Sequence, residues 1–67
     1  MQTGFQVWMG QAVVLHVALG ESKVPLRGKL LNEGNETVRF RIDGWDIDIY
    51  KNMILSVEHD GMALVTV

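Results

Sequence analysis

Three aspartates around one glycine form the clearest cluster of metal-binding residue types in this sequence. The cluster consists of Asp43, Asp46 and Asp48, with Gly44 between the first two. Hard cations such as Ca²⁺ and Mg²⁺ prefer carboxylate oxygens, but the spacing does not match an EF-hand loop. Strand alternation also puts only Asp46 and Asp48 on one face. We therefore interpret the cluster as a solvated turn and expect no metal site.

Four basic residues alternate along two segments, and such stripes can contact a phosphate backbone. The four are Arg27, Lys29, Arg39 and Arg41. The first two share one strand face and the last two share another, so together they would form a stripe on the outer surface. Alternating charge is also ordinary on an exposed strand, and Glu33 and Glu36 supply balancing negative charge. We favour a solvated face over a lateral RNA contact.

The remaining reactive residue types do not form a catalytic arrangement. Ser56 lies in an apolar run with no histidine nearby in the sequence, so it lacks a base that would activate it. His16 falls on the polar side of its segment and is interpreted as a hydrogen-bonded structural residue, while His16 and His59 are too few and too far apart for a zinc cage. Trp8 and Trp45 are interpreted as buried or interfacial anchors rather than base-stacking platforms. We expect neither an enzyme nor a cofactor.

The small size of the chain makes its stability depend on something besides one core. The sequence has 67 residues, so it forms a single domain, and a domain this small buries only about 60% of its unfolded surface. It contains no cysteine, which excludes disulfides and thiolate metal sites. Hydrophobic residues make up 48% of the chain, which fits surface reserved for neighbouring copies. Oligomerisation is the stabilising device that remains.

Charge and hydropathy bear on partners and location. No run approaches the roughly 18 apolar residues of a membrane span, and no basic segment precedes an apolar one at the N-terminus. We therefore expect a cytoplasmic protein without a membrane partner. The formal net charge is −2, so a nucleic-acid partner requires a local basic patch.

Alternation of apolar and polar residues predicts strands along nearly the whole chain. The predicted strands cover residues 13–19, 24–31, 37–43, 46–50, 53–57 and 62–67. Turn-forming residues separate them at 20–23, 32–35, 43–44 and 59–61. Gly28 lies inside the second strand, which predicts a sharp bend or a close backbone approach there. The pattern indicates an all-β protein.

The first eleven residues fit two structures. Thr3 and Gln6 have the spacing of a helix capping box, which indicates a short helical turn. Phe5, Val7 and Met9 alternate, which indicates a seventh strand instead. Both alternatives stay open.

Five or six short strands with one bent at glycine favour a strongly bent SH3-like barrel. Within this pattern, Leu26-Arg-Gly-Lys-Leu30 forms a Leu-x-Gly-x-Leu motif, and residues 49–57 read IYKNMILSV. This order resembles the Sm-like family (LSM, Hfq-like), in which the Hfq segment places Tyr-Lys-His before an Ile-x-x-Val strand. Asn52 occupies the position of that histidine. The resemblance covers roughly residues 10–58 and implies one Sm-like domain over residues 1–67.

The resemblance implies assembly and a ligand. In Sm-like proteins the strands on either side of the 49–57 motif lie on opposite sheet edges, and each pairs with a neighbouring subunit to close a ring. The resemblance implies that Tyr50, Lys51 and Asn52 face the central pore, where such rings hold single-stranded RNA. Asn35 would replace one of the polar loop residues that position the base.

The sequence departs from the family in two further places. The 49–57 segment lacks the Arg-Gly dipeptide of eukaryotic and archaeal Sm proteins, and residues 1–11 include no basic residue. An acidic homo-oligomeric ring that serves structure or binds protein partners without RNA is therefore the alternative. A third possibility is an SH3-like adaptor subunit that stays monomeric until its partner arrives. Lys51 is accordingly either a pore cation or an ordinary surface lysine.

Overall fold

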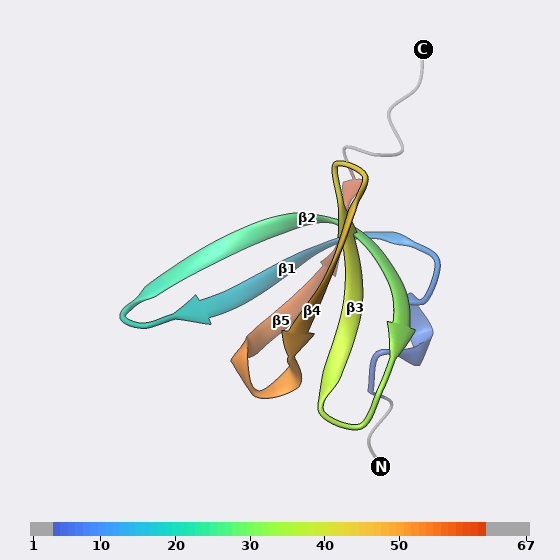
Figure 1. The fold of residues 1–67 in the computed structure, drawn as a ribbon. Coiled ribbons are helices and arrows are strands. Elements are labelled where there is room, and N and C mark those ends of the chain that lie inside the picture. The colour runs from blue at the N-terminus through green and yellow to red at the C-terminus, as the bar shows by residue number, and fades with distance from the viewer. Residues whose placement is uncertain (1–3, 62–67) are drawn as a thin grey trace.

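The computed structural model describes residues 4–61, which form five strands and two short 3-10 helices (Figure 1). In chain order the elements are η1 (Gln6–Trp8), β1 (Ala12–Leu19), β2 (Ser22–Glu33), β3 (Thr37–Ile42), β4 (Trp45–Tyr50), η2 (Lys51–Met53) and β5 (Ile54–His59). The all-β prediction is confirmed. The strand predicted over residues 62–67 and Thr3 of the predicted capping box lie outside the described residues.

All five strands form one antiparallel sheet in the order β4-β3-β2-β1-β5. Strands β1 to β4 pair with their sequence neighbours, whereas β5 returns to pair with β1 (Figure 1). Strands β4 and β5 are therefore the two edges of the sheet. No ladder joins these edges within the described part of the chain, so the sheet is strongly bent but not closed into a barrel.

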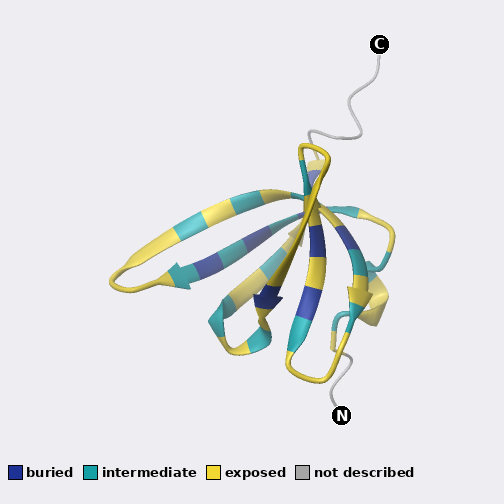
Figure 2. Cartoon of the chain, in the orientation of Figure 1, coloured by how far each residue is buried: buried dark blue, intermediate teal, exposed yellow. Residues whose placement is uncertain are grey.

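The core lies along one face of the bent sheet. Among the described residues it contains seven buried apolar side chains: Val13, Leu15, Val17, Leu30, Val38, Phe40 and Ile49. Buried residues alternate with less buried ones along β1 and β3, as the banding in Figure 2 shows. This period-2 burial follows from the alternating sequence pattern, because successive side chains in a strand point to opposite faces.

Gly28 allows β2 to pass close to β3. A Cβ atom on Gly28 would lie 2.1 Å from the carbonyl oxygen of Arg41 and 2.9 Å from the ring of Phe40. No side chain fits in that space, so the close backbone approach predicted from the sequence is confirmed. The long β2 strand curves over the core, which Figure 1 shows as an arch.

The N-terminal segment adopts the helical alternative. Residues Gln6–Trp8 form the 3-10 helix η1, and the N–H of Gly10 donates a hydrogen bond of 2.8 Å to the carbonyl oxygen of Leu30. Phe5, Trp8 and Met9 pack against the core. The segment thus covers one end of the sheet, and the alternative of a seventh strand at residues 1–11 is wrong for the described part.

Several strand boundaries differ from the prediction by one or two residues. Strand β2 begins at Ser22 and continues to Glu33, so part of the predicted 32–35 turn is strand. Strand β5 continues to His59, two residues beyond the predicted end. The turn between β3 and β4 is as predicted: Asp43 and Gly44 both have positive φ angles, 52° and 84°, which is typical of a tight hairpin turn. No helix within residues 4–61 is long and apolar enough to cross a membrane.

Candidate nucleic-acid interface

Three of the predicted site residues are consecutive at the bend between the edge strands. Tyr50 ends β4, and Lys51 and Asn52 belong to η2, which leads into β5 at Ile54. The N–H of Ile54 donates to the carbonyl oxygen of Lys51 and closes the turn. Tyr50 and Asn52 are exposed, with 56% of Tyr50 accessible, while Lys51 is half-buried. An aromatic ring and an amide are thus available to solvent at this bend.

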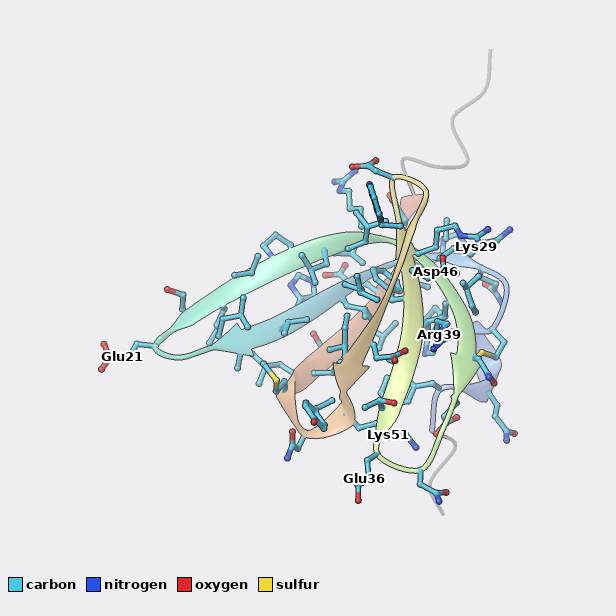
Figure 3. All side chains as sticks on the ribbon, in the orientation of Figure 1. Glu21, Lys29, Glu36, Arg39, Asp46 and Lys51 are labelled. Carbon is cyan, nitrogen blue, oxygen red and sulfur yellow. The ribbon has the colours of Figure 1, made fainter. Side chains whose placement is uncertain are left out.

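The fourth predicted residue, Asn35, lies in the loop that connects β2 and β3. This loop contacts the bend, because the N–H of Lys51 donates a hydrogen bond of 2.8 Å to the carbonyl oxygen of Glu36. The labelled side chains of Glu36 and Lys51 lie at the same end of the molecule in Figure 3. The structure therefore brings the loop of Asn35 next to the bend, although 13 residues lie between Glu36 and Tyr50 in the sequence.

The ammonium group of Lys51 is already bound within the chain. Its Nζ atom lies 2.6 Å from Oε2 of Glu33, and the two side chains are only 29% and 19% exposed. The other carboxylate oxygen of Glu33 accepts a hydrogen bond of 3.3 Å from the N–H of Phe5. The hydrogen bond from Lys51 lowers the pKa of Glu33, and burial only partly opposes it. Glu33 thus joins the end of β2, the bend and the N-terminal segment.

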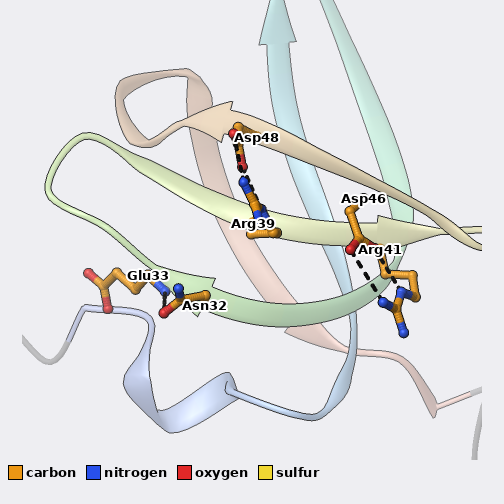
Figure 4. Close-up of polar contacts among 6 residues, drawn as sticks. All are labelled: Asn32, Glu33, Arg39, Arg41, Asp46 and Asp48. Carbon is orange, nitrogen blue, oxygen red and sulfur yellow. Dashed lines mark hydrogen bonds and ion pairs between the residues drawn. The ribbon is translucent and has the colours of Figure 1, made fainter.

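The arginines of β3 are neutralised by the aspartates of β4 (Figure 4). Arg39 donates to Asp48 at 3.0 and 3.4 Å, and Arg41 donates to Asp46 at 2.8 and 3.3 Å. These bonds raise the pKa of both arginines, and the Arg41 guanidinium lowers the pKa of Asp46. The two arginines are more than half exposed. The solvated-face interpretation holds for them, but their partners are aspartates of β4, not Glu33 and Glu36.

The other basic residues differ in their surroundings. Arg27 lies 3.7 Å from Asp60, whose side chain is 9% exposed. Lys23 and Lys29 are exposed, and no carboxylate of residues 4–61 forms an ion pair with them. Of the four basic residues in the predicted stripe, only Lys29 has no ion-pair partner in the described part of the chain.

Asp46 and Asp48, the two clustered aspartates that were expected to share one strand face, both lie on β4. Both carboxylates are engaged by arginines, and no group of three acidic, histidine or cysteine residues within residues 4–61 is arranged to hold a metal ion. A shallow polar depression of about 180 Å³ lies nearby. It is lined by Asn32, Gly34, Thr37, Arg39 and Asp48. Because Arg39 and Asp48 bond to each other at its wall, the depression belongs to the solvated face.

The remaining singled-out residues have structural surroundings. Nε2 of His16 lies 2.5 Å from Oε2 of Glu58 across β1 and β5, so His16 is hydrogen-bonded as predicted. Trp8 is partly buried against the core. Trp45 is 75% exposed in the single chain, so of the two predicted alternatives, buried or interfacial, burial within the chain does not apply to it. An interfacial position for Trp45 stays a prediction.

Both edge strands expose apolar side chains. On β4 these are Trp45, Ile47 and Tyr50, which are 75%, 38% and 56% exposed. On β5, Leu55 is 51% exposed. Large apolar side chains beside unpaired strand edges are typical of surfaces that associate with another chain.

Comparison with known proteins assigns no family to this geometry. No protein-family model matches the chain, and neither a curated protein nor a solved structure matches it. Functional inference therefore rests on the bend, the neighbouring loop and the two edge strands.

Proposed function

We propose that this chain is a non-catalytic subunit of an Sm-like ring that acts in the cytoplasm and binds single-stranded RNA at its pore. The observation that supports this proposal best is the strand order β4-β3-β2-β1-β5. Among the described residues it leaves β4 and β5 as free edges, and these two strands flank the Tyr50-Lys51-Asn52 bend of the 49–57 motif, as the family resemblance implies. In a closed ring, strands of the neighbouring subunits would pair with the two edges of each bent sheet.

Assembly by edge pairing is physically reasonable for this chain. Strands β4 and β5 each have six residues, and each has one side without a strand partner within the described residues. An open edge is a row of unpaired N–H and C=O groups, and head-to-tail pairing around an axis would satisfy these groups in every subunit. The same pairing would cover part of the exposed surface of Ile47 and Leu55.

In the proposed ring, the bend supplies the RNA site. The ring of Tyr50 would stack on a base, and the amide of Asn52 would bind a base edge. Lys51 would bind a phosphate, and Asn35 would reach the same RNA from the adjacent loop. The hydrogen bond between Lys51 and Glu36 supports this grouping, since it holds the loop and the bend together.

A second candidate function is an acidic homo-oligomeric ring that binds protein partners or serves structure without RNA. The ion pairs favour this alternative, because Glu33 neutralises Lys51 and the aspartates of β4 neutralise Arg39 and Arg41. A ring with a net negative charge per subunit would repel RNA unless the local contacts at the bend overcome that repulsion.

Fluorescence anisotropy of labelled oligo-U and oligo-A RNA, measured at two salt concentrations, distinguishes the two functions. The RNA proposal expects salt-sensitive binding that Lys51→Ala weakens strongly, since the pore would lose one cation per subunit. Lys23→Ala is the matched control, because it removes an equal charge from an exposed lysine near the tip of the β1–β2 hairpin. Absence of binding at micromolar protein, in a sample whose mass in solution is that of an oligomer, would favour the acidic ring.

A further inference from the structure

Glu33 occupies the position at which an RNA phosphate would meet Lys51. Its carboxylate oxygen lies 2.6 Å from the Lys51 ammonium, which is the geometry of a short charge-assisted hydrogen bond. Among the described ion pairs of lysine or arginine, this pair has the least exposed basic side chain. Lys51 is 29% exposed and Glu33 is 19% exposed. Water therefore screens this pair less than the arginine–aspartate pairs on β3 and β4.

Glu33 is held in this position from its other side. The N–H of Phe5 donates to Oε1, while Lys51 binds Oε2, so each carboxylate oxygen has its own donor. Glu33 is also the last residue of β2, which limits the positions its backbone can take. A side chain that is already ordered loses little conformational entropy when it binds the lysine, and this makes it an effective competitor.

We propose that Glu33 is a specificity-determining residue that acts as an internal competitor of phosphate at Lys51. The proposal rests on the RNA function proposed above. A phosphate group must displace the Glu33 carboxylate before it binds the ammonium, so isolated phosphates and weakly bound polyanions are rejected. RNA is accepted when contacts to the base, from Tyr50 and Asn52, add to the phosphate contact. Glu33 thus shifts recognition from charge alone toward base contacts.

The decisive variant is Glu33→Gln, because glutamine has the shape of glutamate and keeps an oxygen that accepts the Phe5 N–H. It removes the negative charge beside Lys51 and puts an amide NH2, which cannot accept a hydrogen bond from the ammonium, in the place of Oε2. Glu33→Ala is a second variant that offers no polar group to Lys51. Glu21→Gln is the matched control, since it changes the net charge equally at the hairpin tip, far from Lys51 (Figure 3).

The measurement is anisotropy of labelled oligo-U RNA, with inorganic polyphosphate as an unlabelled competitor that has no bases. Glu33→Gln is expected to bind RNA about tenfold more tightly than the original chain, because one internal charge-assisted bond no longer competes. Its affinity should fall more steeply with salt, and polyphosphate should compete better. Glu21→Gln should bind as the original chain does. Adding Lys51→Ala to Glu33→Gln should remove the gain.

Each other outcome separates the inference from the proposed function. Binding by Glu33→Gln with none by the original chain would support the competitor role and refute RNA binding by the unmodified ring. Equal RNA affinity of the two would overturn the competitor role and leave the RNA function intact. If Glu21→Gln gained as much RNA affinity as Glu33→Gln, the change in net charge would explain the gain, and the competitor role would be overturned. No binding by any variant would overturn both, and loss of folding in both Glu33 variants would assign Glu33 to stability alone.

Discussion

Charged residues in this chain are mostly used in pairs. Arg39, Arg41 and Lys51 each bind a carboxylate of the same chain, and Arg27 lies near Asp60. The arginine pairs join neighbouring strands, whereas the Lys51 pair joins three separate segments through Glu33. The same kind of interaction therefore has two roles: it supports strand pairing on the exposed face, and it fixes the surroundings of the candidate ligand lysine.

The paired carboxylates predict how stability depends on pH. The pKa of Asp46 is lowered in the folded chain by Arg41, so its contribution is fully present above the ordinary aspartate pKa. That contribution is lost as the pH falls through the lower folded-state pKa. Asp46→Asn should therefore show a smaller loss of stability between neutral and acid pH than the original chain, as measured by urea midpoints across that range. Glu21→Gln is the control. If the urea midpoint of Asp46→Asn fell with pH as steeply as that of the original chain, Asp46 would not be the source of this pH dependence.

Some of these pairs could be predicted from the sequence and one could not. Arg39 and Arg41 alternate with apolar residues before the Asp43-Gly44 turn, and Asp46 and Asp48 alternate in the same way after it. A tight hairpin turn therefore places each arginine opposite an aspartate. The pair of Lys51 with Glu33 joins different hairpins. It also depends on β2 continuing through residues that look like a turn, because Asn32 and Glu33 precede Gly34 and Asn35.

Among the elements, strand β2 follows a path that depends on one residue, Gly28. Its curvature needs the missing side chain at Gly28, where the Arg41 carbonyl oxygen leaves no space for a Cβ. Alternation was sufficient to predict the buried faces of β1 and β3, whose burial has a period of two, whereas β4 and β5 are mostly exposed and show no such period. It could not choose between helix and strand for the N-terminal segment, because a three-residue helix such as η1 is too short to show a distinct period.

The close contact at Gly28 predicts a large effect of a one-carbon change. Gly28→Ala should destabilise the fold by about 2 kcal/mol or more, because the backbone of β3 must move away from the added methyl group. Gly61→Ala is the control: an added Cβ there meets nothing within 4 Å. Chemical denaturation monitored by tryptophan fluorescence measures both. Equal midpoints for the two variants would show that β2 and β3 can separate at no cost.

At the scale of the whole molecule, the two edge strands are the surfaces through which the proposed ring would assemble. Within residues 4–61 the core contains seven buried apolar residues, and apolar side chains remain exposed along β4 and β5. The proposed ring would use these edges as the second source of stability that a domain of this size needs.

A charge placed on one edge tests that assembly. Leu55→Lys should lower the mass in solution from an oligomer to a monomer, because a lysine on a strand edge opposes pairing with another strand. Leu19→Lys is the matched control, since Leu19 is 47% exposed but lies at the end of β1, which has a partner on each side in the sheet. Light scattering coupled to size-exclusion chromatography measures the mass. A Leu55→Lys variant that keeps the oligomeric mass would exclude the β5 edge from the interface.

The pairing of β5 with β1 also has a consequence for how the chain folds. Strands β1 to β4 join through three hairpins whose contacts are local, but Val13 pairs with His59 across 45 intervening residues. Forming that pairing first would close a long loop at a high entropic cost. The four-stranded meander is therefore expected to form early, and β5 is expected to dock late. Until β5 docks, β1 would have an open edge, and at that stage strands of two chains would be able to exchange.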